Sequence, residues 1–224
     1  FFVVFLCNIA QATKGDAKEE LAYSSNNNYI LLISACPPWK TGLTKFCKNG
    51  ITELAKILKT RMGAEQDNIY IILDEQATYK EVKKGFKWLK NKTNSNPNSR
   101  AIVYMNLHGG SKPLDDFSGP NSLWTDFIDH HKEHEMFVLW SIKRPATVDD
   151  ALYKKEWILA KDVRKMLDPI NSEKIIIIDS CHAGLAGNDL INNNTREAFI
   201  FSSPPLTISQ ANFQKGEALF TSYL

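Results

Sequence analysis

Two residues in this chain, a cysteine and a histidine, are best suited to do chemistry, and each ends an apolar run. Cys181 comes three positions after four consecutive isoleucines, and His108 comes directly after the apolar run 101–107. A cysteine becomes a strong nucleophile when its thiol loses a proton, and an imidazole can take that proton. The two residues need not be close in sequence if the fold brings them together. They therefore form a candidate dyad for attack on a carbonyl group.

The apolar runs before these residues are predicted to be strands of one parallel sheet. Strand 174–179 contains four β-branched residues in a row, which is typical of strands covered on both faces. Open α/β sheets bind ligands beyond the carboxyl ends of their strands. If strand 101–107 lies beside strand 174–179, His108 and Cys181 leave the sheet side by side. Gly109 would let the backbone approach a substrate, so the amides of Gly109 and Cys181 are candidates for an oxyanion hole.

The order of strand and helix patterns predicts the architecture around the dyad. Further apolar strands are expected at 29–34, 68–73 and 198–202, and helices at 44–62, from Thr78 onward, and at 162–167. Thr78 and Glu81 form the sequence signature of a capping box. A last helix is expected to begin at Gly216 and continue toward Leu224. This order favours an α/β fold with helices on both faces of a mainly parallel sheet.

The chain resembles the caspase and metacaspase superfamily of cysteine peptidases. The resemblance rests on the strand that ends in His108-Gly109 and on the Asp-Ser-Cys-His-Ala-Gly motif at 179–184, and it covers 28–224. This motif is closer to metacaspases and bacterial caspase-like proteins than to animal caspases. The resemblance implies a caspase-like three-layer α-β-α sandwich. It also implies a cysteine endopeptidase that needs no cofactor and uses His108 and Cys181.

The resemblance further implies which residues bind the substrate. In metacaspases the acid two positions before the cysteine binds Arg or Lys at the residue preceding the cut, and here that acid is Asp179. A carboxylate pairs with a cation and rejects acidic side chains. The family serine two positions before the histidine is Asn106 here, and the family acid after Cys-x-Asn is Gly50, following Cys47. We therefore expect cleavage after Arg or Lys, with Asp179, Asn106 and Cys47 in the substrate-binding site.

Other functions remain open at this point. A legumain-like peptidase, which cuts after Asn, shares the His-Gly and Cys arrangement but usually has Glu at the position of Asp179. A non-catalytic caspase-like interaction domain would have the same fold, although the intact His108 and Cys181 favour catalysis. A structural cysteine in a nucleotide-binding α/β domain fits less well, because Ser34-Ala-Cys-Pro-Pro follows the first strand in place of a Gly-rich phosphate loop.

The region 111–160 fits the strand and helix order least well. The interval from His108 to Cys181 is longer than the roughly 50 residues of animal caspases, so we expect an inserted hairpin and loop bordering the active site. His130, His131 and His134 lie in this region, but no Cys or second His cluster completes a zinc site. No metal site is predicted. Many metacaspases need calcium, and calcium is kept as a candidate activator although the scattered acids form no compact calcium loop.

Composition and chain ends bear on compartment and partners. The chain has 224 residues and a net charge of +2, so nothing indicates a nucleic-acid partner. Residues 1–12 resemble the end of a secretory signal peptide, and their apolar run is too short to span a membrane. We expect a secreted or periplasmic protein that acts on proteins or peptides, or a cytoplasmic one if 1–12 is not a signal. The chain is expected to be truncated after Leu224, and its oligomeric state stays open.

Three cysteines would remain after signal cleavage: Cys36, Cys47 and Cys181. One of them must stay free to act as a nucleophile. Cys36 and Cys47 could pair in an oxidising compartment, and the sequence leaves this pairing open.

Overall fold

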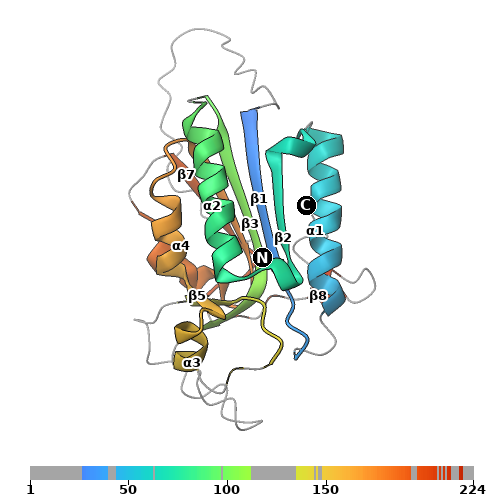
Figure 1. The fold of residues 1–224 in the computed structure, drawn as a ribbon, viewed down its shortest axis with the longest axis vertical. Coiled ribbons are helices and arrows are strands. Elements are labelled where there is room, and N and C mark those ends of the chain that lie inside the picture. The colour runs from blue at the N-terminus through green and yellow to red at the C-terminus, as the bar shows by residue number, and fades with distance from the viewer. Residues whose placement is uncertain are drawn as a thin grey trace.

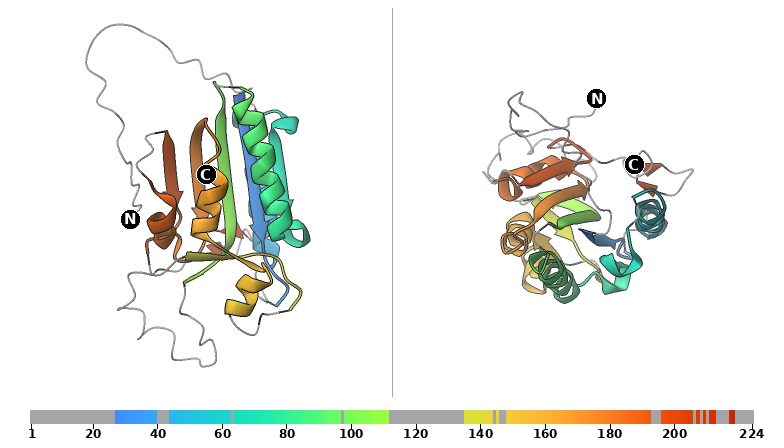
Figure 2. Two further views of the ribbon diagram at one scale, coloured as in Figure 1. Left: turned by 60° about the vertical axis from the view of Figure 1, so that its left-hand side comes forward. Right: turned by 90° about the horizontal axis from the view of Figure 1, so that it is seen from above.

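The computed structural model describes residues 27–39, 44–62, 64–96, 98–111, 135–143, 145, 148–192, 196–205, 207, 209, 211–212 and 217–218. These residues form the expected α/β fold, a mainly parallel sheet between two helical layers (Figures 1 and 2). The signal-like segment 1–12 and the histidines His130, His131 and His134 lie outside the described residues.

Seven strands of the described chain form one sheet. Five are parallel, in the order β2-β1-β3-β6-β7: β1 (Asn28–Ala35), β2 (Ile69–Leu73), β3 (Arg100–Ser111), β6 (Glu173–Asp179) and β7 (Glu197–Phe201). Two antiparallel strands continue from the carboxyl end of β3: β4 (Glu135–Val138) and β5 (Trp157–Leu159). The short helix α3 (Val148–Tyr153) precedes β5. The described part of region 111–160 thus extends the sheet from the strand that carries His108.

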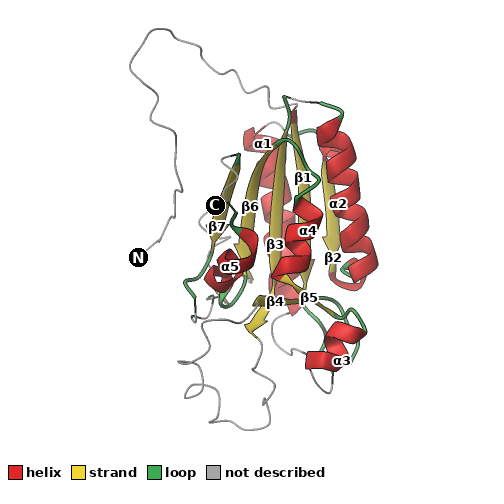
Figure 3. Ribbon diagram, turned by 90° about the vertical axis from the view of Figure 1, so that its left-hand side faces the viewer, coloured by secondary structure: helices red, strands yellow, loops and turns green. Residues whose placement is uncertain are grey.

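Helix α1 (Thr44–Met62) covers one face of the sheet, with the bounds that its apolar periodicity predicted. It buries a stripe at helical spacing, Ile51, Leu54, Ala55 and Leu58, against β1 and β3. Helices α2 (Tyr79–Asn94), α4 (Ala160–Leu167) and α5 (Gly187–Leu190) bury their apolar side chains in a second cluster on the opposite face (Figure 3). The Thr78 side chain accepts the Glu81 amide at the start of α2, which confirms the predicted cap.

The alternation of side chains along β3 decides which face carries the candidate site. Val103, Met105 and Leu107 belong to the cluster under α2 and α4, whereas Ile102 and Tyr104 belong to the cluster under α1. Successive side chains of a strand point to opposite faces. Asn106 and His108, which continue the even-numbered series, therefore lie on the α1 face of the sheet.

The prediction of a helix from Gly216 is wrong for the residues described there. Glu217–Ala218 forms the short strand β9, which pairs in antiparallel fashion with β8 (Ala211–Asn212). Strand β9 lies against α1. The helical pattern is overridden here because Glu217–Ala218 pairs with β8. The periodicity of a single segment does not predict such pairing.

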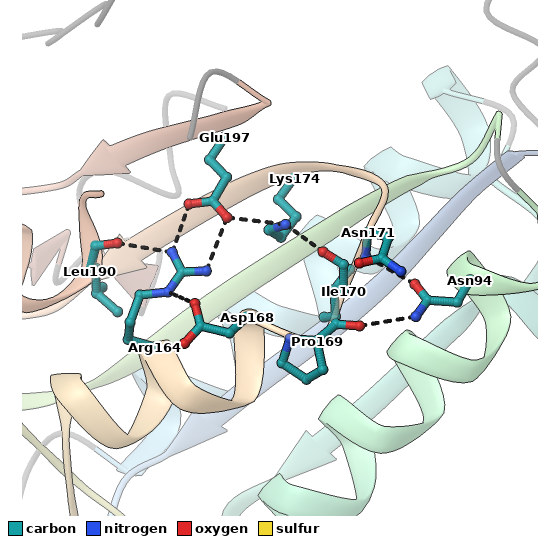
Figure 4. A network of polar contacts seen from close by, with 9 residues as sticks. All are labelled: Asn94, Arg164, Asp168, Pro169, Ile170, Asn171, Lys174, Leu190 and Glu197. Carbon is teal, nitrogen blue, oxygen red and sulfur yellow. Dashed lines mark hydrogen bonds and ion pairs between the residues drawn. The ribbon is translucent and has the colours of Figure 1, made fainter. Parts of the chain in front are cut away.

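A buried group of ions joins the amino ends of β6 and β7 to α4 (Figure 4). Arg164 donates to both carboxylate oxygens of Glu197 at 2.6 and 3.0 Å, and Lys174 approaches the same carboxylate at 3.0 Å. Burial alone would raise the pKa of Glu197, but the hydrogen bonds from Arg164 and Lys174 outweigh it and hold the pKa below its usual value. Each charged group pairs with a group of opposite sign, so we assign this cluster a structural role. It lies at the amino end of β6, whereas Cys181 follows the carboxyl end.

Candidate active site

Strands β3 and β6 are direct neighbours, as predicted for strands 101–107 and 174–179. They pair in parallel, with Asn106 opposite Asp179. His108 lies two residues beyond Asn106, and Cys181 lies two residues beyond Asp179. The expectation that the strand ends before His108 is wrong, because β3 continues to Ser111 and His108 pairs there with Val138 of β4. Cys181 does follow the end of β6, so the two candidate catalytic residues lie at the same level of adjacent strands.

Gly109 packs against the backbone of the residue that carries the candidate nucleophile. A Cβ atom added at Gly109 would lie 2.0 Å from the carbonyl oxygen of Cys181 and 2.6 Å from Oε1 of Glu135. Both distances are far shorter than a carbon atom tolerates, and the first involves backbone. Only glycine permits this approach, so Gly109 sets how closely the turn after β6 lies against β3.

The dyad residues are more accessible than the polar residues behind them. His108 and Cys181 are both partly exposed, and Cys181 is the cysteine of the described chain that is not in a disulfide. Asn106 is 8% exposed and Asp179 only 2%. Cys181 is therefore partly open to solvent, while Asp179 lies deeper in the protein.

A row of buried polar residues crosses the central strands beside the dyad. Ser34 on β1 is opposite Asn106, which is opposite Asp179. Asp179 accepts a hydrogen bond from the Tyr104 hydroxyl at 2.9 Å on Oδ2, and one from the Ser209 hydroxyl at 3.3 Å on Oδ1. Nδ2 of Asn106 is buried without an acceptor in the structure as described. The row thus combines an oriented carboxylate with an unused amide donor.

The nucleophile loop, Ser180–Gly184, is tied to the segment that follows β7. The His182 amide donates to the Thr207 carbonyl at 2.7 Å, and the Gly184 amide donates to the Ser203 carbonyl at 3.0 Å. The Ser203 hydroxyl accepts the Ala183 amide and donates to the Ser180 carbonyl, both at 3.0 Å. Three consecutive amides after Cys181 are therefore already used within the protein.

His182 has a strained backbone and a buried ring. Its φ of 59° lies in the left-handed region, which is uncommon for residues other than glycine. The side chain is 8% exposed, and burial lowers the pKa of His182 because water no longer stabilises the charged ring. This ring is therefore expected to be neutral at pH 7 and is distinct from His108, the candidate base.

We expect His182 to make the protein less stable as the pH falls. Its pKa is depressed in the folded state, so its contribution is complete above the unfolded value of about 6.5 and is lost as the pH falls through the folded pKa. The added slope is at most about 1.4 kcal/mol per pH unit for one proton. Urea unfolding of wild type and His182→Asn between pH 8 and pH 5 measures it, since asparagine tolerates the same backbone conformation. Parallel curves for the two proteins would contradict this expectation.

The sulfur of Cys47 is not free to contact a substrate. Cys47 is bonded to Cys36, which follows β1, and both residues are buried. The Cys47 carbonyl accepts the Ser34 hydroxyl at 3.2 Å, and the Cys36 amide donates to Asp74 Oδ1 at 3.2 Å. Cys36 and Cys47 therefore form the disulfide that the sequence left open. Through its hydrogen bond from Ser34, Cys47 stabilises the β1 end of the row of buried polar residues.

Three residues near the candidate site were missed by sequence reasoning. Tyr104 could have been found, because it is two positions before Asn106 and four before His108 and so shares their face. Ser209 and Glu135 carried no comparable signal. Ser209 reaches Asp179 only through the chain path after β7, and Glu135 is fully buried beside Gly109 through the β3–β4 pairing.

Comparison with known proteins gives only distant likeness, to solved structures. No protein-family model and no curated protein matches the chain. The crystal structure of protein GSU0716 from Geobacter sulfurreducens is similar, with 14% sequence identity and a TM-score of 0.44, covering 70% of this chain and 52% of that chain. The chain therefore spans about half the length of that protein. This likeness carries no information on function.

None of the described helices combines the length and the apolar character that a membrane span requires.

Proposed function

We propose that this protein is a cysteine endopeptidase of the caspase and metacaspase type, with His108 as the base and Cys181 as the nucleophile. The observation that carries the proposal is the parallel register of β3 and β6, in which Asn106 lies opposite Asp179, two residues before His108 and Cys181 respectively. The close packing of Gly109 on the Cys181 carbonyl adds to it. A histidine and a partly exposed cysteine outside any disulfide, at such a position, have the types and the accessibility that nucleophilic catalysis requires.

The chemistry follows from these two side chains. His108 takes the proton of the Cys181 thiol, and the sulfur attacks the carbonyl carbon of the scissile peptide bond. When the C–N bond breaks, the imidazolium returns the proton to the leaving amine and a thioester remains. A water molecule, deprotonated by His108, then hydrolyses the thioester and restores the thiol.

The oxyanion formed during this attack needs N–H donors. The amides of His182, Ala183 and Gly184 are already hydrogen-bonded within the protein. This supports the assignment of the oxyanion hole to the amides of Gly109 and Cys181 themselves. Gly109 suits this role because its missing side chain allows it to lie directly against the Cys181 backbone, so the two amides belong to neighbouring segments.

Asp179 is proposed to select Arg or Lys at the residue preceding the cut. It lies beside the nucleophile loop, is 2% exposed, and has a hydroxyl donor on each oxygen. A carboxylate held in a pocket of low water content attracts a guanidinium or ammonium group and repels acidic side chains. Asn106 completes the proposed pocket, and the disulfide-bonded Cys47 supports its edge through the hydrogen bond from Ser34.

One observation favours a second specificity, cleavage after Asn. The side-chain carboxamide of asparagine needs both a donor for its oxygen and an acceptor for its NH2 group. Asn106 Nδ2 is a buried donor whose hydrogen-bonding capacity is unused in the structure as described, and Asp179 in the adjacent strand is an acceptor. A legumain-like specificity is therefore retained as the alternative.

The remaining properties are proposals that accompany this function. The chemistry needs no cofactor, and calcium is a candidate activator. Proteins or peptides are the expected partners. A disulfide between Cys36 and Cys47 is typical of proteins in oxidising compartments, which favours a secreted or periplasmic location over a cytoplasmic one.

Peptide profiling tests the proposed function most directly. Purified protein is incubated with a library of peptides that differ at the residue preceding the scissile bond, with and without calcium, and the products are identified by mass spectrometry. Cleavage after Arg and Lys is expected, and cleavage mainly after Asn would select the alternative. No cleavage under either condition would favour a non-catalytic interaction domain.

A further inference from the structure

We propose that the outer face of α2, together with two short segments at its amino end, binds the anionic surface of a lipid bilayer. This surface, called the basic face below, is formed by Lys80, Lys83, Lys84, Lys87 and Lys90 of α2 and by Ile142, Tyr153 and Lys155 of the two segments. The inference goes beyond the proposed peptidase function and does not depend on it.

The positive charge of the chain is concentrated in α2. This helix holds six of the 27 basic residues and one of the 25 acidic residues, Glu81, so its net charge is +5. Because the whole chain has a net charge of +2, the rest of it has a net charge of −3. Five of the six lysines are exposed, and Glu81 pairs with Lys84. The protein therefore presents one strongly positive helix on an otherwise slightly negative chain, which is the charge distribution that an anionic partner complements.

The spacing of these lysines does not serve the helix itself. Lys80 and Lys84 lie four positions apart, as do Lys83 and Lys87. Like charges at this spacing are neighbours on the helix surface and destabilise it. An anionic surface lying along the helix would offset this repulsion.

A lysine from another segment joins this surface at a cost to its backbone. Lys155 follows α3 with a φ of 60°, a conformation in which glycine or asparagine is usual after a helix. Its Nζ lies 5.3 Å from the centre of the Tyr79 ring, and Nζ of Lys83 lies 5.8 Å from the same centre. The ring attracts each cation, and it holds two positive charges together at the amino end of α2. A less strained residue would end α3 equally well, whereas anion binding gains from a lysine there.

Two apolar side chains protrude beside the same end of α2. Tyr153 and Ile142 are the most exposed large apolar side chains of the described chain, at 86% and 77%. Tyr153 is two residues before Lys155, and α3 lies just beyond the amino end of α2 (Figure 3). The segment of Ile142 is held there by the Trp140 amide, which donates to the Ala77 carbonyl at 3.0 Å. A bilayer surface accepts both kinds of group, since lysines bind its headgroups and apolar side chains enter the interface. This combination favours a membrane over a soluble polyanion.

The basic face is separate from the candidate active site. Helix α2 packs on one face of the sheet, whereas Asn106 and His108 lie on the α1 face. A protein bound to a bilayer through α2 would therefore keep the α1 face directed toward solution.

Vesicle binding by the full chain tests the inference without any need for catalysis. The bound fraction is measured by flotation with vesicles of equal parts phosphatidylglycerol and phosphatidylcholine, and with vesicles of phosphatidylcholine alone. Lys87→Gln/Lys90→Gln removes two charges from the basic face. The matched control is Lys48→Gln/Lys56→Gln, which removes two exposed lysines from α1 on the opposite side of the sheet.

We expect binding to the anionic vesicles that weakens with added salt and is lost with phosphatidylcholine alone. Lys87→Gln/Lys90→Gln should weaken it about 25-fold, or about fivefold for each lysine near an anionic surface, and the α1 control should leave it unchanged. Ile142→Ser/Tyr153→Ser should weaken it at least about fivefold, because two apolar side chains no longer enter the interface. Thermal unfolding of each variant is followed in parallel.

No binding to anionic vesicles, equal binding to both kinds of vesicle, or equal weakening by the two lysine pairs would overturn the inference. Tighter binding to a thymidine oligonucleotide than to the vesicles, with no effect of Ile142→Ser/Tyr153→Ser, would assign the face to a soluble polyanion instead. If Lys87→Gln/Lys90→Gln lowers the unfolding temperature, Lys155→Gly decides, since glycine suits the backbone at that position. This variant should unfold no earlier than wild type and bind anionic vesicles about fivefold more weakly, and unchanged binding would count against the proposal.

Discussion

Replacing Cys181 or His108 with alanine is expected to lower peptidase activity at least about a thousandfold while the fold stays intact. Cys181→Ala removes the atom that forms the thioester. His108→Ala removes the group that takes the thiol proton and later protonates the leaving amine. Initial rates on the best peptide from the library, with circular dichroism and thermal unfolding of each variant, measure the effect.

Two controls distinguish loss of the dyad from general damage. The double variant His108→Ala/Cys181→Ala should be no less active than either single variant, because the two residues act as one unit. Alkylation of Cys181 by iodoacetamide, followed by mass spectrometry, should be slower at neutral pH in His108→Ala, since less thiolate is present. Activity of either single variant within tenfold of wild type would show that the dyad assignment is wrong.

Asp179→Asn is expected to cost about 2–4 kcal/mol in transition-state binding of Arg and Lys substrates, because their charge would then be buried without a partner. The isosteric amide keeps the volume of the side chain, so packing against Tyr104 and Ser209 changes little. The measurement is kcat/KM for matched peptides with Arg, Asn or Asp before the scissile bond.

The three peptides separate the pocket from the chemistry, which matters because Asp179 is two residues from Cys181. A loss confined to the Arg peptide supports the charge pocket, whereas an equal loss for all three would mean that Asp179 acts on the nucleophile loop. Preference of the wild type for Asn would move the protein to the legumain-like alternative. Preference for Asp would reverse the pocket assignment, because Asp179 would repel that side chain.

Local patterns in the sequence were sufficient for most of the secondary structure. The apolar stripe of 44–62 and the cap at Thr78 predicted α1 and the start of α2, because helices bury one face at a period of about 3.6 residues. Apolar runs predicted β1, β3 and β6, because central parallel strands are buried on both faces, and they also predicted the outer strands β2 and β7. These signals are local, because the residue pattern of each element depends on how that element itself is buried.

The candidate dyad was also visible in the sequence, since His108 and Cys181 each follow a predicted strand. That prediction assumed that the two strands are neighbours in the sheet. The tertiary structure decided it, placing Asn106 opposite Asp179 and Gly109 against the Cys181 carbonyl. Register depends on which side chains pack together across the sheet, and no single strand specifies that.

The surroundings of the dyad came from the tertiary structure alone. The Tyr104 hydroxyl meets Asp179 across 75 positions of the chain, and Ser203 holds the nucleophile loop from beyond β7. The Cys36–Cys47 bond and strand β9 were likewise decided by contacts between separate segments. Periodicity and turn signals indicate which residues of a segment are exposed to water and which are buried in the core. They do not state which distant segment supplies the partner, because that choice is made only when the whole chain minimises its unpaired polar groups and exposed apolar surface together.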